Sequence, residues 1–582
     1  MRILENRIPF VLCLSILTFS QLQAADLPAG ATPGGVLPNL NYEITEPFVY
    51  PDATYPVDEV ENVRPEDVNA PRMQVRGFRI NGVIPHEKSG INLASIEQMV
   101  RTKALELVAG EASQGFTLSM FEAINVAIGR YYREKGFFLA RAYIPAQKIE
   151  NDIVTINIVE GYIDQILISG NRLYSDEQLD ELFLPLQGEA IFLDNVENAV
   201  FIANDYPGMK ASVLFGPGLE PGSAALQVNI KEETSDGYVT FDNYGSSFTG
   251  ENRLRGNYQF YNLLGVADRL DLNGILTLQP QNSLYYDIAY QQPVLANRYL
   301  VGGSYNSNEF DVGGDLTDLG INGTSTALRG FMTRIMSRER TARVTSTVDL
   351  SLKESTSRVV SSLNSRDKLA VIGASANYAG TSWSNSRAYQ QISAKLSIGL
   401  AGFLGSMDNN GDGLSGRRGS IQDRAGGDFT KINIDYLRVS QLTEFQSLLL
   451  RFSGQTTPDI LTSMEQFSLG GPDTVRAYPV AEALVDKAWL VSVEWRADAS
   501  PEIPQTWLNK LHFSVFYDYA TGTLNEPLTN DFASVSLSGF GFGAQVQPFN
   551  KFTAKMQLAF DLGDEPSESQ SVPFYFSLRY DF

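Results

Sequence analysis

The spacing of hydrophobic residues along this chain changes near Lys231. Before that point, several segments repeat a hydrophobic residue every three or four positions, which is typical of amphipathic helices. Beyond it, hydrophobic and polar residues alternate in one segment after another, and this period of two predicts strands with one apolar and one polar face. We therefore expect a mixed α and β part followed by an all-β part.

Two similar units are predicted in the mixed part, over residues 73–161 and 162–234. In the first, one strand is followed by two helices and then by two further strands. The second repeats this β-α-α-β-β order, with helices that begin near Ser175 and Asp194. The repeat predicts two copies of one α+β module.

Side chains that cap helices mark the helix boundaries in these units. The helices of the first unit are expected over residues 93–109 and 119–135. Ser119 is followed three residues later by a glutamate, and Ser175 by a glutamine, which is the spacing of a capping box. The helix over 119–135 also has an apolar stripe that we expect in the core of the module: Phe121, Ile124, Ile128 and Tyr131.

About sixteen alternating segments are predicted over residues 235–582. An even number of such strands, with long and short connections in turn, is typical of bacterial outer-membrane barrels, whose outer loops are long and whose periplasmic turns are short. A large β-sandwich would alternate in the same way, and the loop lengths favour the barrel. The expected fold is two α+β modules followed by an all-β transmembrane barrel of about 16 antiparallel strands.

The last residues of the chain alternate up to a terminal aromatic residue. Leu578, Tyr580 and Phe582 share one face of the last predicted strand. Such endings resemble the recognition signal of outer-membrane barrels. They imply the barrel-assembly machinery as a partner during biogenesis and the lipid of the outer membrane as the surroundings.

The first residues have the pattern of a secretory signal. Arg2 and Arg7 precede an apolar stretch that is followed by small residues, which predicts a signal peptide over residues 1–24. The chain's one cysteine, Cys13, would be lost with it. Residues 25–72 are rich in proline, glycine and acids, and we expect them to form an extended linker.

Composition excludes two classes of protein. Lys and Arg total 45 against 67 Asp and Glu, and the resulting formal charge of −22 would repel the phosphates of a nucleic acid. Beyond the signal peptide no apolar run reaches the roughly 18 residues that a membrane-spanning helix needs. Nucleic acid is therefore not an expected partner, and a helical membrane protein is not the expected fold.

Candidate chemistry is sparse. Residues 408–413, DNNGDG, match the start of a calcium-binding loop, but Gly419 stands where that loop has its glutamate, so a glycine-rich turn is favoured and no metal is predicted. His512 lies close to Ser514 in the sequence, as in an outer-membrane lipase, without a nucleophile motif around the serine. We expect neither a cofactor nor an enzyme.

One arginine stands out in a loop between predicted strands. Residues 470–479, GGPDTVRAYP, place Arg476 in the long loop over 456–487. In a later strand, Asp518 shares the face of Phe516 and lies opposite the aromatic residues that would face lipid, so its carboxylate is expected to face the lumen. An arginine paired with this aspartate would be held in one position. A solvated loop arginine is the alternative.

Four motifs in order resemble one family. They are YIPAQ at 143–147, IVEG at 158–161, VRAY at 475–478 and FYD at 516–518. Together with two modules before a barrel of this size, they resemble the outer-membrane transporters of two-partner secretion. These are the haemolysin secretion/activation type of the Omp85 superfamily, and the likeness extends over nearly the whole chain after residue 72.

The resemblance implies a transport function. The modules would be POTRA modules in the periplasm that bind an unfolded exoprotein bearing an amino-terminal secretion domain, and Ala140, Tyr143 and Ile144 are the expected capture residues. The exoprotein, such as a haemolysin, adhesin or toxin, would then pass through the barrel. An assembly factor that inserts other barrels is a second interpretation from the same superfamily, and a passive porin is a third.

The resemblance also assigns the loop. In the family, the long loop folds back into the lumen and its arginine meets an aspartate of the wall. The matching tip residues are Val475, Arg476 and Tyr478, and the matching wall residues are Phe516 and Asp518. The family's glycine is replaced by Ala477, which is expected to strain a tip that needs a positive φ. The family's amino-terminal plug helix is not expected here, because residues 26–45 contain several prolines and glycines.

Overall fold

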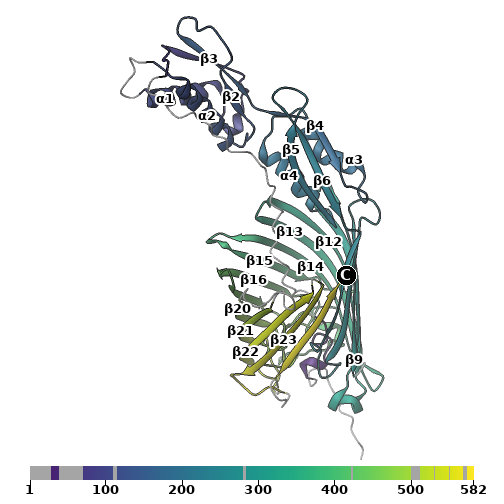
Figure 1. Cartoon of the computed structure of the whole chain (residues 1–582). Helices are drawn as coiled ribbons and strands as arrows, with labels where there is room; N and C mark the ends of the chain where they lie inside the picture. The colour runs from purple at the N-terminus through teal and green to yellow at the C-terminus, as the bar shows by residue number, and fades with distance from the viewer. Residues whose placement is uncertain are drawn as a thin grey trace, which may run out of the picture.

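The computed structural model shows two small α/β modules in line with one end of a closed β-barrel (Figure 1). The structure describes residues 28–38, 70–108, 115–279, 283–295, 297–420, 424–499, 511–529, 531–549, 551–567 and 573–582. The signal peptide predicted over residues 1–24 and most of the linker predicted over 25–72 lie outside these residues. No helix in the described part of the chain is long and apolar enough to cross a membrane.

The first module has the predicted order of elements. Its three-stranded sheet has the order β1-β3-β2, with β1 parallel and β2 antiparallel to the central β3. Two helices cover one face of this sheet (Figure 1). The elements are β1 (Gly77–Asn81), α1 (Leu93–Leu107), α2 (Leu118–Glu134), β2 (Arg141–Tyr143) and β3 (Ile153–Val159), with a short 3-10 helix η3 (Glu87–Ser89).

Helix α2 begins differently from the prediction. Thr117, not Ser119, is the N-cap residue, and its hydroxyl accepts a hydrogen bond from the Met120 backbone NH at 3.3 Å. Two residues with hydroxyl groups, two positions apart, could each cap this helix. The prediction of Ser119 from the capping-box spacing was wrong. The predicted stripe is buried as expected at Phe121, Ile124 and Ile128, whereas its last position is taken by Tyr132 instead of Tyr131.

The second module repeats the first. Its sheet has the order β4-β6-β5, and the predicted capping box of Ser175 with Gln178 is present at the start of α3. The elements are β4 (Tyr162–Ser169), α3 (Asp176–Phe183), η4 (Leu184–Leu186), α4 (Leu193–Asn204), β5 (Met209–Pro217) and β6 (Ser223–Glu232).

Sixteen antiparallel strands close the barrel, as predicted. Each barrel strand pairs with the barrel strands before and after it in the sequence, and the barrel closes where the last strand pairs with the first. The strands are β7 (Ser235–Asp242), β8 (Asn252–Tyr261), β9 (Arg269–Gln279), β10 (Ser283–Val294), β11 (Tyr299–Asp311), β12 (Asn322–Glu339), β13 (Ala342–Val359), β14 (Ser362–Ser382), β15 (Asn385–Gly399), β16 (Thr430–Thr443), β17 (Gln446–Thr456), β20 (Lys487–Asp498), β21 (Leu511–Thr523), β22 (Ser534–Phe549), β23 (Phe552–Asp561) and β24 (Phe574–Asp581).

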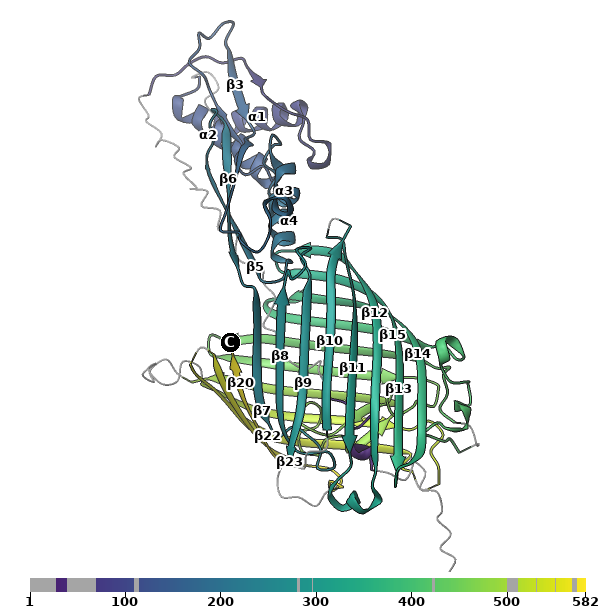
Figure 2. The same ribbon diagram turned by 90° about the vertical axis from the view of Figure 1, so that its right-hand side faces the viewer.

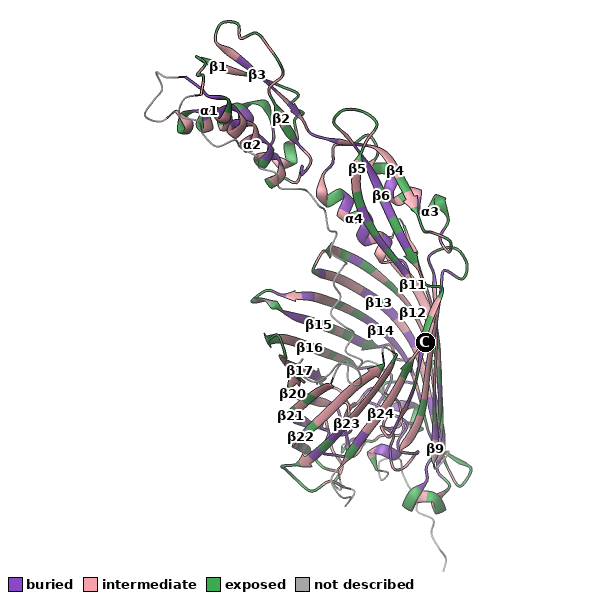
Figure 3. Ribbon diagram, in the orientation of Figure 1, coloured by how far each residue is buried: buried purple, intermediate pink, exposed green. Residues whose placement is uncertain are grey.

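The two faces of the barrel wall differ in exposure along each strand (Figure 3). In β21, Phe513 and Tyr517 are exposed on the outer face, while Phe516 and Asp518 are buried on the lumen face. The alternation follows from the period of two in a strand. It places apolar rings outside and polar groups inside.

The second module contacts the barrel through ion pairs. Asp205, after helix α4, lies 2.6 Å from Arg338 Nε and 3.2 Å from Arg343 Nη1, and Glu197 pairs with Arg340. The three arginines belong to β12, β13 and the turn between them, at the end of the barrel next to the modules (Figure 2). We call this the module end, and the opposite end, with the longer connections, the loop end.

A short amino-terminal segment lies inside the barrel near the loop end. Residues 28–38 form a compact turn that includes the 3-10 helix η2 (Ala29–Ala31), seen in purple between the barrel strands in Figure 2. The extended linker expected here is therefore replaced, over these residues, by a folded turn. The glycines and prolines that argued against a helix permit a tight turn with close backbone contacts.

Candidate functional site

The candidate site is a loop that lies inside the barrel. Residues 457–486, which connect β17 to β20, contain the small hairpin β18 (Phe467–Leu469) and β19 (Ala483–Val485). We call these residues the lumen loop. Its tip packs in one apolar cluster with lumen-facing residues of β20, β21, β22 and β23: Ala488, Leu490, Phe516, Ala520, Leu537 and Ala559.

Arg476 at the tip is bound to the wall by two carboxylates and a hydroxyl group. Its Nε and Nη2 each lie 2.8 Å from a different carboxylate oxygen of Asp518. Its Nη1 donates to Glu494 at 2.7 Å, and Nη2 also donates to the Ser492 hydroxyl at 3.2 Å. The structure thus brings together the arginine and the aspartate that the sequence singled out.

The electrostatic surroundings suit a buried guanidinium. Arg476 is 4% exposed and Asp518 is fully buried. The guanidinium carbon lies 3.3 Å from the centre of the Phe516 ring, which provides a cation–π contact. Glu494 is shared with Arg496, whose Nε lies 2.8 Å from the other carboxylate oxygen. Buried charges of this kind are stable only when they are paired and hydrogen-bonded.

The two other predicted tip residues are buried as well. Val475 and Tyr478 have no exposed surface. The Tyr478 hydroxyl donates to the Asp564 carbonyl at 2.8 Å, and the Tyr478 carbonyl accepts from the Tyr575 hydroxyl at 3.1 Å. The tip therefore contacts the inner wall at several strands, from β20 through to β24.

Ala477 does not strain the tip, contrary to the expectation from the sequence. Its φ is not positive, so the alanine adopts an ordinary backbone conformation. Its side chain is buried against Gly539 of β22, where an added Cβ would lie 2.3 Å from the Ala477 Cβ. The missing side chain in the wall makes room for the extra methyl group in the loop.

A second ion-pair cluster holds the first limb of the lumen loop. Glu465 is buried, and its carboxylate lies 2.6 Å from Lys353 of β13 and 2.8 Å from Lys431 of β16. The Glu465 carbonyl also accepts a hydrogen bond from Gln455 at 3.1 Å. These contacts join the loop to strands on either side of β14 and β15.

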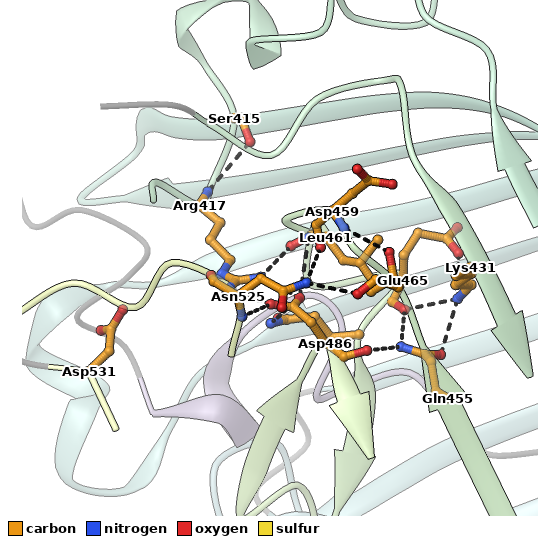
Figure 4. A network of polar contacts seen from close by, with 12 residues as sticks. Ser415, Arg417, Lys431, Gln455, Asp459, Leu461, Glu465, Asp486, Asn525 and Asp531 are labelled. Carbon is orange, nitrogen blue, oxygen red and sulfur yellow. Dashed lines mark hydrogen bonds and ion pairs between the residues drawn. The ribbon is translucent and has the colours of Figure 1, made fainter. Parts of the chain in front are cut away.

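A third cluster lies at the base of the lumen loop (Figure 4). Asp486 is fully buried, and its two oxygens accept hydrogen bonds from Arg417 Nη1 at 2.5 Å and Nη2 at 2.8 Å. Arg417 comes from the connection between β15 and β16, so it reaches the base from another loop.

The sequence identified only part of these contacts. Glu494 lies on the same strand face as Ser492, and this parity is a signal that would have found it. Glu465, Asp486 and Arg417 carry no comparable signal, because their contacts depend on the paths of long loops.

The amino-terminal turn contacts both the lumen loop and the opposite wall. An added Cβ at Gly34 would lie 1.9 Å from the Ser463 carbonyl of the lumen loop. On the other side, Ala31 is buried in a cluster with Phe310, and Asn308 donates to the Val36 carbonyl at 3.3 Å. Turn and loop line one cavity of about 530 Å³.

The predicted capture residues of the first module differ in exposure. Ala140 is buried in the core of the module, so it presents no surface to a partner and the prediction is wrong for this residue. Ile144 packs against the same core. Tyr143 is 48% exposed at the end of β2, which is one of the two edge strands of the sheet. Of the three residues, the tyrosine is the most exposed, and Ile144 is half-buried.

The other predicted features are placed as follows. Tyr580 and Phe582 are exposed on the outer face, and Leu578 is half-buried in β24. In residues 408–413, the Asp412 carboxylate accepts a hydrogen bond from the Asp408 backbone NH at 2.9 Å, as in a local turn. His512 Nδ1 lies 2.5 Å from a carboxylate oxygen of Asp498 on the neighbouring strand.

Comparisons with known proteins give a consistent result. The family described as haemolysin secretion/activation protein ShlB/FhaC/HecB matches residues 222–546, and a ShlB-type POTRA domain matches residues 86–161. The heme/hemopexin transporter protein HuxB of Haemophilus influenzae is 23% identical over 477 residues, which cover 80% of this chain and 81% of HuxB.

Solved structures share the fold. CdiB from Escherichia coli has a TM-score of 0.67 at 18% identity, and the alignment covers 90% of this chain and 93% of the CdiB chain. CdiB from Acinetobacter baumannii has a TM-score of 0.58 at 18% identity, with 92% and 94% covered.

Proposed function

Because this chain belongs to the haemolysin secretion/activation family ShlB/FhaC/HecB, we propose that its barrel carries one large unfolded exoprotein out of the cell. The protein is an outer-membrane transporter of two-partner secretion, with its POTRA modules in the periplasm. The module end of the barrel is then the entrance and the loop end is the exit. The observation that carries the proposal is the buried contact of Arg476 with Asp518, which fixes a loop inside a barrel that two modules precede.

Capture begins at the first module. Its edge strand β2 has one side free of a neighbouring strand within the sheet, and an extended segment of the exoprotein adds to such an edge through backbone hydrogen bonds. The exposed Tyr143 at the end of this strand supplies an aromatic contact beside the added segment. The secretion domain of the exoprotein is the partner that this surface fits.

Passage requires the lumen contents to move. The lumen loop and the amino-terminal turn fill part of the interior, and they contact each other. A barrel of 16 strands is wide enough for an extended chain once these segments are displaced. Folding of the exoprotein outside the cell supplies the driving force, because a segment that has folded there can no longer slide back through the barrel.

Biogenesis uses the end of the chain. Leu578, Tyr580 and Phe582 in and after β24 form the signal that the barrel-assembly machinery binds. Lipid of the outer membrane then surrounds the exposed aromatic residues of this strand and its neighbours, such as Tyr580.

Loss of the gene tests the proposal against an assembly role. A secretion transporter predicts that one very large protein disappears from the culture medium, while the outer-membrane proteins keep their normal amounts. Depletion of many outer-membrane proteins would support an assembly factor, and an unchanged medium would support a passive porin. Quantitative proteomics of both fractions distinguishes the three outcomes.

Deletion of residues 73–160 tests the capture step. This removes the first module, and we expect export of the exoprotein to be abolished while the barrel still assembles. Heat-modifiable migration of the barrel in gels is the control for folding. Normal export by the shortened protein would contradict capture by this module.

A further inference from the structure

The connection between β15 and β16 crosses the loop end of the barrel. We call residues 400–429 the crossing loop; the structure describes them except for 421–423. On one side, the Gly416 backbone NH donates to Asp367 of β14 at 3.1 Å, and Met407 is buried in a cluster with Leu369 of the same strand. That cluster also contains Leu461 of the lumen loop, so the crossing loop is folded inward over the lumen.

On the other side, the crossing loop contacts Asp486 at the base of the lumen loop. Arg417 forms a two-point contact with this carboxylate at 2.5 and 2.8 Å, and Nη1 also donates to the Leu461 carbonyl at 3.0 Å. Two-point contacts between guanidinium and carboxylate fix orientation as well as distance. The Arg417 side chain thus makes a polar attachment between the crossing loop and the base of the lumen loop, beside the apolar contact of Met407 with Leu461.

Asp486 joins a third segment to the same point. Its carboxylate accepts a hydrogen bond from the Asn525 backbone NH at 2.7 Å, and Arg417 Nη2 donates to the Asn525 carbonyl at 3.1 Å. Asn525 lies in the connection between β21 and β22. Next to it, the Ser420 backbone NH donates to the Glu526 carbonyl at 3.1 Å. One ion pair with a buried carboxylate thus lies where three connections meet at the loop end (Figure 4).

We infer that Arg417 and Asp486 are positioning residues that hold the crossing loop over the exit of the barrel and release it when the exoprotein leaves. This inference rests on the proposed function for the direction of export. The closed state itself needs no exoprotein, so it can be measured separately.

The pair is suited to a reversible closure. Asp486 has no exposed surface, and loss of its one guanidinium would leave a buried carboxylate without a charged partner. The same carboxylate becomes stable again when the loops move apart and water reaches it. The ion pair is therefore strong while the three connections are together, and its loss weakens the attachment of the crossing loop to both of the others.

Permeability of the barrel tests the closed state. Arg417→Ala is expected to give a several-fold higher single-channel conductance in planar bilayers and a several-fold greater sensitivity of cells to vancomycin, which the outer membrane normally excludes. Arg417→Lys retains the charge but not the two-point contact, so we expect an intermediate effect. Arg418→Ala is the matched control, because Arg418 is the adjacent arginine with an exposed side chain.

Asp486→Asn provides a second variant that keeps the shape of the side chain. It should open the barrel as Arg417→Ala does, and the double variant should be no leakier than the leakier single variant. Each variant is compared at equal amounts of heat-modifiable barrel. Conductance and vancomycin sensitivity equal to those of Arg418→Ala, in barrels that fold normally, would overturn the inference.

A covalent tether tests the release. Ser420→Cys with Glu526→Cys places two thiols on backbones that are hydrogen-bonded to each other, in a chain whose one natural cysteine is Cys13. Oxidised cells should lose export of the exoprotein, and a reductant should restore it, while each single cysteine variant exports normally in both conditions. Normal export by the fully cross-linked protein, or failure of the two cysteines to cross-link, would contradict the inference.

The permeability measurements and the tether experiment together distinguish failure of the inference from failure of the proposed function. If the protein exported nothing, the tether arm would show no export in any variant, yet Arg417→Ala would still open the barrel. If the closure did not exist, export would continue through the tethered protein.

Discussion

At the scale of single residues, the environment of Arg476 determines how firmly the lumen loop is held. The guanidinium is nearly fully buried and faces two carboxylates, Asp518 and Glu494, as well as the Phe516 ring. Removing one partner of such a buried pair costs about 3–5 kcal/mol, because the remaining charge loses its compensation. The tip therefore has one strongly preferred position rather than several of similar free energy.

Arg476→Ala is expected to reduce secretion strongly without preventing insertion of the barrel, because the sheet closes through backbone hydrogen bonds that this side chain does not make. Asp518→Ala should have a similar but smaller effect, since Glu494 still binds the arginine at 2.7 Å. The double variant should secrete about as little as Arg476→Ala alone, because a shared contact is lost only once. Secretion per folded barrel is the measurement.

Arg496→Ala is the control for this cycle. It removes another arginine bound to Glu494, at 2.8 Å, but leaves the loop tip unchanged. Strictly additive losses from Arg476→Ala and Asp518→Ala, or normal secretion by Arg476→Ala, would show that Arg476 is an ordinary loop residue.

At the scale of elements, the fit of the lumen loop to the wall depends on a glycine in a strand. Gly539 of β22 lies against Ala477, and an added Cβ would be 2.3 Å from the alanine Cβ and 2.9 Å from the Phe560 carbonyl. Such distances require the loop or the wall to move. The Ala477 methyl group therefore fits against the wall because Gly539 has no side chain.

Gly539→Ala is expected to displace the tip and lower secretion. Ala477→Gly in the same chain should restore part of the loss, since it removes the closer of the two clashes. Gly330→Ala in β12 is the control, because an added Cβ there meets nothing within 4 Å. Secretion is again measured per folded barrel, and an equal loss with and without Ala477→Gly would show that the loop and β22 do not depend on each other.

At the scale of the whole molecule, ion pairs contribute to the orientation of the second module relative to the barrel, beside hydrogen bonds such as that from Asn262 to the Leu173 carbonyl at 2.7 Å. Asp205 lies between Arg338 and Arg343, and its side chain is 9% exposed. The contacts join the end of α4 to β12 and β13, next to the entrance of the barrel (Figure 2). A segment bound to the modules is thereby held close to the lumen.

Asp205→Ala should loosen this junction and reduce secretion while the barrel folds normally, because both arginines lose their carboxylate. Spin labels on α4 and on β12 should give a broader distance distribution than in the unmodified protein. Lys210→Ala in the same module is the control, since its side chain is 71% exposed and lies 3.6 Å from Glu233. An unchanged distribution would show that the junction does not depend on these ion pairs.

The sequence by itself determined the features that depend on local periodicity. The order of elements in both modules, the 16 strands and their outward and inward faces all follow from patterns within short segments. The pair of Arg476 and Asp518 was also found from the sequence, through the parity of one strand and the resemblance to a family. Alternation in a strand is a property of consecutive residues, so it needs no knowledge of distant contacts.

Only the tertiary structure decided the contacts that cross the lumen. Arg417 meets Asp486 from a different loop, and the amino-terminal turn meets Ser463 after more than 400 residues of chain. Burial of Ala140 beside the exposed Tyr143 depends on which face of a short edge strand meets the helices. In each case the physical reason is the same. Which residues contact each other is determined by the paths of the loops and by closure of the barrel, and these paths produce no periodic pattern in the sequence.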